Sequence, residues 1–177
     1  VQEDTAMMDN MGTVDGISAS GKDWYNGIAG DIRHMFFKTL ASAQDSIQIS
    51  TYSLGRDNPE VNEFFDKIEE QLTSERNVNI IVDSEHCSKF ARREMRDLKS
   101  RFPNRFTYQI FESESKSLHA KLLVVDRTIA LVGSANISKR ALVSNYEIML
   151  KVSGKAAADI SLMLDNLRKM LEDGRDV

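Results

Sequence analysis

The sequence contains a single cysteine, Cys87, among its 177 residues. One cysteine cannot form an intrachain disulfide or a cysteine-rich zinc site, so a hydrophobic core must hold the fold. No apolar run approaches the ~18 residues of a membrane-spanning helix. The acidic N-terminal residues also lack the basic and apolar stretches of a secretion signal. These absences lead us to expect a cytoplasmic protein with no membrane partner.

The sequence also lacks an excess of basic residues. It has 23 Lys and Arg against 27 Asp and Glu, a formal net charge of −4. Nucleic-acid binding usually leaves a basic footprint, so this balance alone counts against such a partner. With 41% hydrophobic and 28% charged residues, the composition is ordinary for a folded protein. The length suits one domain.

Residues 1–27 are rich in Gly, Asp, Ser and Met and show no periodicity. We expect a flexible N-terminal arm there and a folded domain over residues 28–177. Residues 16–23 nearly spell a phosphate-binding P-loop, but Asp23 stands where that motif needs a Mg²⁺-binding hydroxyl. We interpret this match as a coincidence.

From residue 28 onward, helical and strand periods of hydrophobicity alternate. The expected helices cover residues 28–43, 59–72, 88–100 and a final stretch from 154, and the expected strands cover 47–52, 78–82, 106–111, 120–125, 128–132 and 146–152. Strands that alternate with helices and end in hairpin-connected strands predict an α/β fold. The architecture we expect is a mixed β-sheet flanked by helices on both faces.

The most informative polar side chains surround two adjacent apolar runs. Strand periodicity places His119 and Lys121 on one face of the same strand. The two runs are separated by residues 126–127, which indicates a tight hairpin. A hairpin centred there makes His119 face Ser134 and Lys121 face Val132, at the distance of directly opposed pairs.

These residue types together suit phosphodiester chemistry. Lys121 supplies a positive charge, and Ser134 and Asn136 supply neutral donors, a combination that fits an oxyanion. His119 can act as a nucleophile or proton donor near neutral pH. Glu147, on a later strand, is our candidate for the carboxylate that holds the second ring nitrogen of His119. A lone histidine is usually structural, but the whole set indicates a catalytic site.

The spacing His-x-Lys-x₄-Asp-x₆-Gly-Ser-x-Asn resembles the HKD motif of the phospholipase D superfamily. Its members here are His119, Lys121, Asp126, Gly133, Ser134 and Asn136, and Asn145-x-Glu147 is similar to the family's continuation. The resemblance implies a phospholipase D-like catalytic domain over residues 28–177. It further implies cleavage of a phosphodiester without metal or cofactor, through a phosphohistidine on His119. Lys121, Ser134 and Asn136 would hold the phosphate oxygens, and Glu147 would orient the histidine.

Two residues of the motif are expected to be structural. Asp126 is ~16 Å along an extended strand from Lys121, at ~3.3 Å per residue, too far to share a substrate. Aspartate is favoured in turns, so we predict that Asp126 stabilises the hairpin. Gly133 would let the backbone come close to whatever binds there.

One motif leaves one proton-transfer role unfilled. Covalent catalysis by histidine needs a second group that protonates the leaving oxygen. The other histidines, His34 and His86, lack the accompanying motif residues, and we interpret them as surface or helix-packing residues. We therefore predict a homodimer in which a two-fold axis brings two copies of His119 together.

Basic residues recur at helical spacing after residue 83 and also flank the motif. They are Lys89, Arg92, Arg93, Arg96 and Lys99 on the helix, and Lys116, Lys139 and Arg140 beside the motif. They form either a solvated surface or a nucleic-acid-binding surface that dimerisation doubles.

The short, single-motif chain resembles the dimeric bacterial endonucleases of the superfamily. We therefore expect a nuclease that acts on DNA or RNA. Two alternatives stay open: a phospholipase D or phosphatidyl transferase, and a catalytically silent phosphate-binding or dimerisation module of a longer protein. No basic amphipathic membrane helix favours a lipid substrate.

Overall fold

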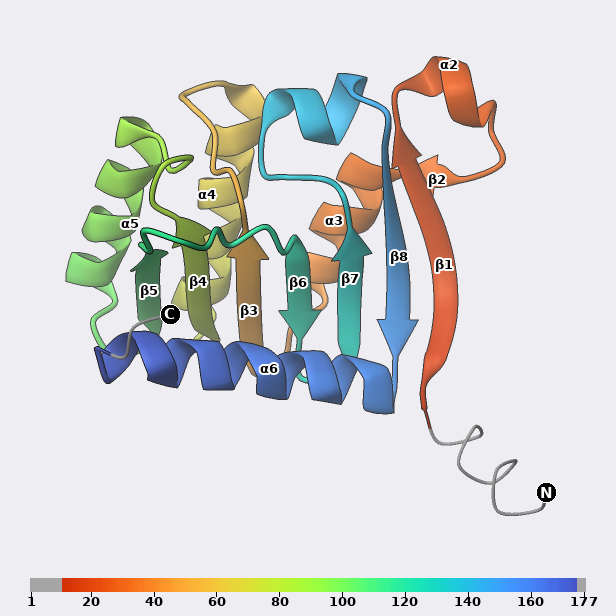
Figure 1. The fold of residues 1–177 in the computed structure, drawn as a ribbon. Helices are drawn as coiled ribbons and strands as arrows, with labels where there is room; N and C mark the ends of the chain where they lie inside the picture. The colour runs from red at the N-terminus through yellow and green to blue at the C-terminus, as the bar shows by residue number, and fades with distance from the viewer. Residues whose placement is uncertain (1–10, 175–177) are drawn as a thin grey trace, which may run out of the picture.

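The computed structural model describes residues 11–174. An eight-stranded sheet forms its centre, in the order β2-β1-β8-β7-β6-β3-β4-β5 (Figure 1). The strands are β1 Thr13–Ser20, β2 Gly30–Asp31, β3 Ser46–Thr51, β4 Asn77–Asp83, β5 Phe106–Phe111, β6 Leu122–Val125, β7 Ile129–Gly133 and β8 Glu147–Ser153. β3, β4 and β5 pair in parallel, whereas β6, β7 and β8 pair antiparallel. The predicted mixed sheet is confirmed.

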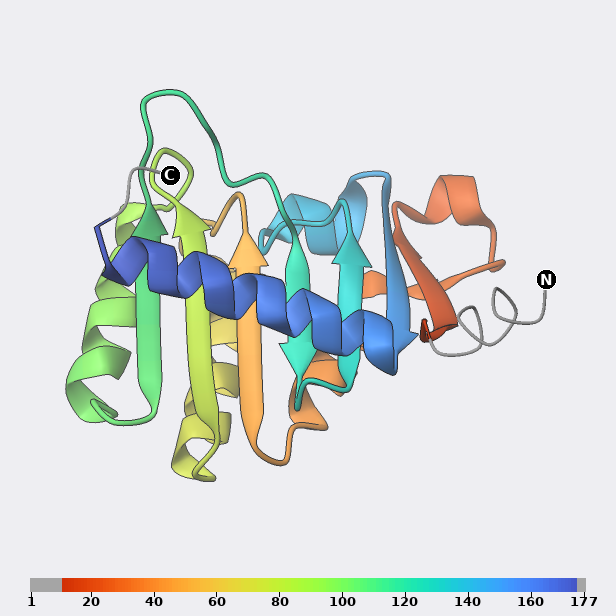
Figure 2. The ribbon, with the colours of Figure 1, turned by 60° about the horizontal axis from the view of Figure 1, so that its bottom comes forward.

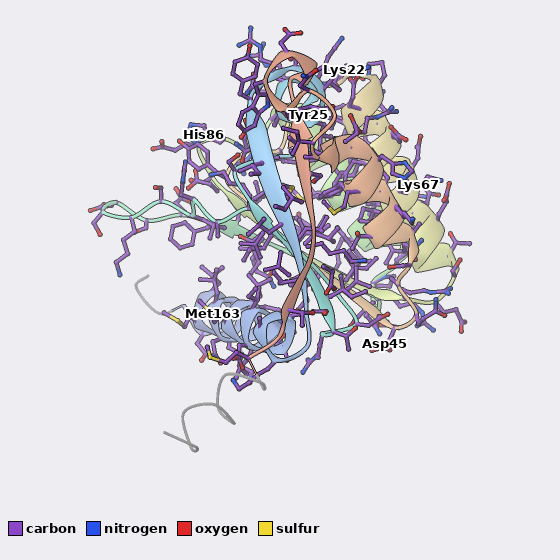
Figure 3. The ribbon with its side chains drawn as sticks, turned by 90° about the vertical axis from the view of Figure 1, so that its right-hand side faces the viewer. Lys22, Tyr25, Asp45, Lys67, His86 and Met163 are labelled. Atoms are coloured by element: carbon purple, nitrogen blue, oxygen red, sulfur yellow. The ribbon has the colours of Figure 1, made fainter. Side chains whose placement is uncertain are left out.

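Helices cover both faces of this sheet, as predicted. They are α2 Lys22–Tyr25, α3 Ile32–Ala41, α4 Pro59–Thr73, α5 Lys89–Arg101, α6 Lys155–Glu172 and the π-helix η1 Arg140–Ser144. α6 crosses one face alone (Figure 2), and α3, α4 and α5 cover the other. An edge-on view separates Met163 of α6 from Lys67 of α4 (Figure 3). Within residues 11–174, no helix combines the length and apolarity needed to cross a bilayer.

Side-chain caps explain where two of the long helices begin. The Asn58 side chain accepts a hydrogen bond from the Val61 N–H, and Pro59 occupies the first turn of α4. Ser88 accepts one from Ala91 at the start of α5. Each such cap satisfies a backbone donor without a helical partner, which stabilises a helix by about 1 kcal/mol.

The strands at the centre of the sheet are buried on both faces. Leu123 and Val125 of β6 belong to the larger core, which α3, α4 and α5 cover. Val124 points the other way and packs in a second cluster with Ala157 and Leu164 of α6. This double burial explains why β6 is a continuous apolar run instead of an alternating one.

The N-terminal segment differs from the expectation of a flexible arm over residues 1–27. β1 pairs antiparallel with β8 along its length and carries β2 on its other edge. The segment that resembles a P-loop therefore lies largely within a strand. β1 escaped detection because its buried face is made by Ser18 and Ser20, each 1% exposed, which gives no hydrophobic alternation. Residues 1–10 lie outside the described part of the chain.

Candidate active site

The polar residues of the motif meet at the edge of the sheet where β3 and β7 end and β6 and β8 begin (Figure 1). A pocket of about 510 Å³ opens at this edge. It is lined by Tyr52, His119, Lys121, Gly133, Ser134, Asn136 and Glu147. The structure thus brings together the five residues that we expected to be catalytic, and adds Tyr52 to them.

The hairpin that carries these residues has a different register from the predicted one. Leu122 pairs with Val132, and the Gly133 N–H donates to the Lys121 carbonyl at 3.4 Å. The turn spans residues 126–128, one residue more than expected, so each opposed pair shifts by one position. Lys121 consequently faces Gly133.

His119 and Lys121 also lie just before β6, not within it as predicted. The shifted register means that His119 does not directly face Ser134. The two residues reach the same pocket because the segment before β6 continues along the edge of the sheet. Chain connectivity, not cross-strand pairing, places His119.

Gly133 serves close packing between two strands of the protein itself. A Cβ atom there would lie 2.1 Å from the Ile148 carbonyl oxygen and 2.8 Å from the Met149 Cα. Both neighbours are backbone atoms of β8, which cannot move aside cheaply. Glycine is therefore required at this position for the pairing of β7 with β8.

Lys121 is a buried cation at the base of the pocket. Lys121 is only 6% exposed, and its Nζ donates a hydrogen bond to the His119 carbonyl at 2.6 Å. Nζ also lies 5.1 Å from the centre of the Tyr52 ring, within cation–π range. Burial lowers the pKa of Lys121, and the negative charge of Glu147 partly opposes this shift. A bound anion would restore the favourable electrostatics that burial removes.

His119 and Asn136 present different groups to the pocket. His119 is exposed, and its ring centre lies 4.6 Å from that of Tyr52. The Asn136 side-chain oxygen accepts the Ser53 N–H at 2.9 Å. Because this backbone donor occupies the oxygen end, the amide NH₂ is the end of Asn136 that can donate to a ligand.

Glu147 contacts other partners than the one we expected. Its Oε2 accepts from Ser134 Oγ at 2.5 Å, and its Oε1 accepts from the Asn145 amide at 3.2 Å. Among the described residues, its side-chain hydrogen bonds do not include one to His119. β7 lies between β8 and β6, which separates those strands by about 10 Å. The Glu147 carboxylate therefore contacts Ser134, the residue that directly follows β7.

Asp126 lies at the opposite edge of the sheet. Its carboxylate accepts the backbone N–H groups of Gln44, Asp45 and Ser46 at 2.8–2.9 Å. Asp45 contacts Asp126, and His86 contacts Tyr52 of the pocket; the two lie far apart in the edge-on view (Figure 3). Burial alone would raise the pKa of Asp126, but the three backbone hydrogen bonds outweigh it and lower that pKa. These contacts fit the structural role that we predicted.

The basic residues of α5 do not form one uniform surface. Arg92 donates to the carbonyls of Cys87 and Ser84, and Lys99 donates to those of Pro103 and Phe106. Arg93 pairs with Glu94 and lies over the Phe90 ring. The remaining basic residues that we singled out are exposed: Lys89, Arg96, Lys116, Lys139 and Arg140. These five residues and the exposed Arg93 are available to an anionic partner.

Sequence reasoning missed Tyr52 and the contact that His86 makes with it. Tyr52 follows β3 directly and therefore reaches the edge of the sheet where the pocket opens. His86, which we interpreted as a surface or helix-packing residue, contacts the Tyr52 hydroxyl at 2.8 Å. The position of Tyr52 at a strand end was the signal that could have identified it. Within residues 11–174, no three His, Cys, Asp or Glu side chains gather as a metal site.

The fold and this pocket define a phospholipase D-like α/β domain. A family model described as "Cardiolipin synthase, PLD-like domain" matches residues 36–169, more than half of the chain. The chain belongs to this family, and the resemblance identified from the motif is confirmed. The crystal structure of the phospholipase D family member NUC from Salmonella typhimurium shares the fold. It superposes with a TM-score of 0.68 at 17% identity, over 88% of this chain and 93% of that one.

Two curated relatives are considerably longer than this chain. The DISARM protein DrmC of Bacillus paralicheniformis is 29% identical over 133 residues, which are 73% of this chain and 53% of DrmC. Cardiolipin synthase 2 of Bacillus cereus is 25% identical over 148 residues, 82% of this chain and 26% of that protein. The chain thus spans about half the length of DrmC and about a quarter of that of the synthase.

Proposed function

We propose that this protein is a cytoplasmic, metal-independent phosphodiesterase that cleaves DNA or RNA through a phosphohistidine on His119. One observation carries the proposal: an exposed imidazole, His119, shares a pocket with a buried cation, Lys121. An unpaired buried cation is costly, and an anionic substrate offsets that cost. The imidazole beside it supplies the nucleophile.

The proposed reaction has two steps. A ring nitrogen of His119 attacks phosphorus, forming the P–N bond as the P–O bond to the leaving group breaks. The leaving oxygen takes up a proton, and water then attacks phosphorus, which frees His119 and the phosphate monoester. Lys121 and the Asn136 amide offset the charge on the non-bridging oxygens. Glu147, held at the pocket wall by Ser134, orients His119 once substrate is bound.

The proton for the leaving oxygen leads us to propose a homodimer with the pocket on its two-fold axis. Four apolar side chains on β1 and around the start of β8 are unusually exposed for their type: Val14 at 61%, Ile17 at 50%, Tyr146 at 65% and Ile148 at 44%. Tyr146 and Ile148 flank Glu147 in the sequence, whereas Val14 and Ile17 pair with Val152 and Leu150 further along β8. Such a patch supports a self-association surface. In that dimer, a second His119 would supply the proton.

Nucleic acid is our preferred substrate because exposed cations flank the motif. The exposed Lys116, Lys139 and Arg140 flank the motif and could contact a phosphate backbone. Net charge averages over the whole chain, so it does not exclude this local surface.

A lipid phosphodiester is the second candidate. It is favoured by the description of the matching family and by the name of the Bacillus cereus relative. A catalytically silent module is less favoured, because a binding site alone has no need for an exposed histidine beside Lys121.

The test compares wild type with His119→Ala in EDTA, on single- and double-stranded DNA and RNA and on phosphatidylglycerol vesicles. Cleavage of nucleic acid by wild type alone supports the proposal. Turnover confined to vesicles would replace it with the lipid reading, and no turnover of either would favour the silent module. His34→Ala is the matched control, because His34 is exposed on α3 and lines no part of the pocket.

Dimerisation needs its own measurement. We expect sedimentation to show a dimer, and specific activity to fall on dilution below its dissociation constant. Full activity of a demonstrated monomer at nanomolar concentration would contradict the shared site.

A further inference from the structure

Three rings make contact at one side of the pocket. The Tyr52 ring contacts both the His86 ring and the His119 ring, with centroid distances of 3.9 Å and 4.6 Å and interplanar angles of 32° and 59°. The contact with Tyr52 therefore limits the orientations that the His119 ring can adopt.

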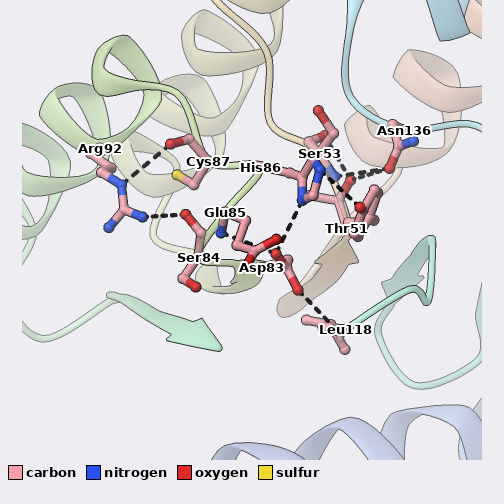
Figure 4. A network of polar contacts seen from close by, with 11 residues as sticks. Thr51, Ser53, Asp83, Ser84, Glu85, His86, Cys87, Arg92, Leu118 and Asn136 are labelled. Atoms are coloured by element: carbon pink, nitrogen blue, oxygen red, sulfur yellow. Dashed lines mark hydrogen bonds and ion pairs between the residues drawn. The ribbon is translucent and has the colours of Figure 1, made fainter. Parts of the chain in front are cut away.

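Polar contacts link His86 to Asp83, and Asp83 to the backbone of Leu118 (Figure 4). The Tyr52 hydroxyl lies 2.8 Å from His86 Nε2, and His86 Nδ1 lies 3.3 Å from Asp83 Oδ1. Asp83 is buried, 4% exposed, and its Oδ2 accepts the Leu118 N–H at 3.0 Å. Asp83 is thus linked to His119 in two ways. One link runs through His86 and Tyr52, and the other through the backbone of Leu118, the residue before His119.

The chemistry of the groups determines which atom donates and which accepts in each hydrogen bond. An ionised carboxylate can only accept, so His86 Nδ1 carries the hydrogen that faces Asp83. In the neutral ring Nε2 then accepts the hydroxyl hydrogen of Tyr52. This arrangement fixes the rotation of Tyr52, whose ring face also attracts the Lys121 ammonium.

We propose that Asp83, His86 and Tyr52 form a positioning chain that holds the His119 ring in the orientation for attack on phosphorus. The proposal rests on the proposed function and deepens it. Asp83 and His86 act through Tyr52, and Tyr52 acts on the His119 ring. Rate depends steeply on such placement, since a misplacement of about 1 Å costs up to ~10²-fold.

A different role for the same residues would be proton donation from His86 through the Tyr52 hydroxyl to the leaving oxygen. The two roles respond differently to the leaving group. p-Nitrophenolate leaves readily without a proton, whereas an alkoxide needs one. Positioning therefore affects both kinds of substrate, and proton donation affects mainly the alkoxide.

The kinetic test measures kcat and KM of wild type, Tyr52→Phe, His86→Gln and the double variant. The substrates are bis(p-nitrophenyl) phosphate and an oligonucleotide. Because the two variants break the same hydrogen bond, we expect each to lower kcat about tenfold on both substrates, and the double variant to lower it no further. KM should change less than about twofold, because neither the Tyr52 hydroxyl nor the His86 ring is expected to bind the phosphate.

Three kinetic results would overturn the proposal. They are unchanged kcat in both single variants, a multiplicative hundredfold loss in the double variant, and a loss confined to the oligonucleotide. Thermal unfolding of each variant separates these effects from loss of fold. His34→Gln is the matched control and should retain wild-type kcat.

A second readout is independent of turnover. The chain has three histidines, so their ring ¹⁵N signals can be assigned with His34→Gln and His86→Gln. Tyr52→Phe should shift the His119 ring signals and leave those of His34 in place. Unchanged His119 signals would overturn the positioning chain even if kcat fell. If wild type cleaves no substrate, the proposed function fails, and these spectra still decide whether the chain positions His119.

Discussion

Ser134 Oγ donates a hydrogen bond to Glu147 Oε2 at 2.5 Å and accepts one from the backbone N–H of Ile148 at 3.1 Å. This pair joins the end of β7 to the start of β8 at the wall of the pocket. The single hydroxyl hydrogen is thus used within the protein, and the oxygen also accepts one hydrogen bond. Its main effect in this structure is to hold the Glu147 carboxylate in place.

Removing that hydroxyl should therefore act through Glu147. We expect Ser134→Ala and Glu147→Gln each to lower kcat on bis(p-nitrophenyl) phosphate by about tenfold or more, and their effects to be non-additive in the double variant. Ser100→Ala, an exposed serine at the end of α5, is the control. Additive losses would show that Ser134 and Glu147 act separately.

Lys121 should set the alkaline limit of activity. Its protonated form is the one that binds phosphate, and burial lowers its pKa. As pH rises, Lys121 should therefore lose its proton, and activity should fall, at a lower pH than with an exposed lysine. Lys121→Arg, which stays charged, should move the alkaline limb of the kcat/KM profile to higher pH. An unchanged limb in a folded Lys121→Arg variant would assign that limb to another group.

Asp126 should govern stability and leave the chemistry intact. Asp126→Ala removes three hydrogen bonds to a carboxylate from a turn residue with φ of 52°, a conformation that alanine adopts poorly. We expect a loss of about 3 kcal/mol in unfolding free energy, with kcat unchanged where the protein is folded. Asp159→Ala, from an exposed pair with Lys155, should cost under ~0.5 kcal/mol. Wild-type stability with abolished turnover would refute the structural role.

The same carboxylate predicts an acid dependence. Because folding lowers the pKa of Asp126, its contribution is fully present above the unfolded value of about 3.9 and is lost as pH falls through the folded value. Denaturant titrations of wild type and Asp126→Ala should therefore converge at low pH. A constant difference between them down to pH 2 would contradict this linkage.

Two glycines offer a matched comparison of backbone packing. A Cβ at Gly133 would lie 2.1 Å from a carbonyl oxygen of β8, whereas one at Gly16 would have no neighbour within 4 Å. We expect Gly133→Ala to destabilise the protein by several kcal/mol, on the order of 3, or to prevent folding. Gly16→Ala should change stability by less than about 1 kcal/mol. Equal unfolding midpoints for the two variants would contradict the contact between β7 and β8.

Cys87 should be chemically inert in the folded protein. It is 7% exposed, and burial raises its pKa to about 11. Because the thiolate is the reactive form, iodoacetamide at neutral pH should modify Cys87 only in denaturant. Rapid modification of the native protein would indicate local opening at the start of α5.

Most elements followed from hydrophobic period, because packing and local pattern agree there. The helix predicted over residues 59–72 is α4, Pro59–Thr73, since Pro59 and the Asn58 cap fix its start locally. The strand predicted over residues 106–111 is β5, Phe106–Phe111. β1 was missed because its burial depends on pairing with β8, which lies more than a hundred residues away in the chain.

By itself, the sequence determined the family and the motif residues that line the pocket, though not Tyr52, because the spacing from His119 to Asn136 encodes one hairpin and its ends. It also indicated the separate place of Asp126, since an extended strand has a fixed length. Only the tertiary structure decided the register of that hairpin, the attachment of Glu147 to Ser134, and the chain from Asp83 through His86 to Tyr52. These relationships join segments far apart in sequence, and their geometry depends on how the strands pack side by side.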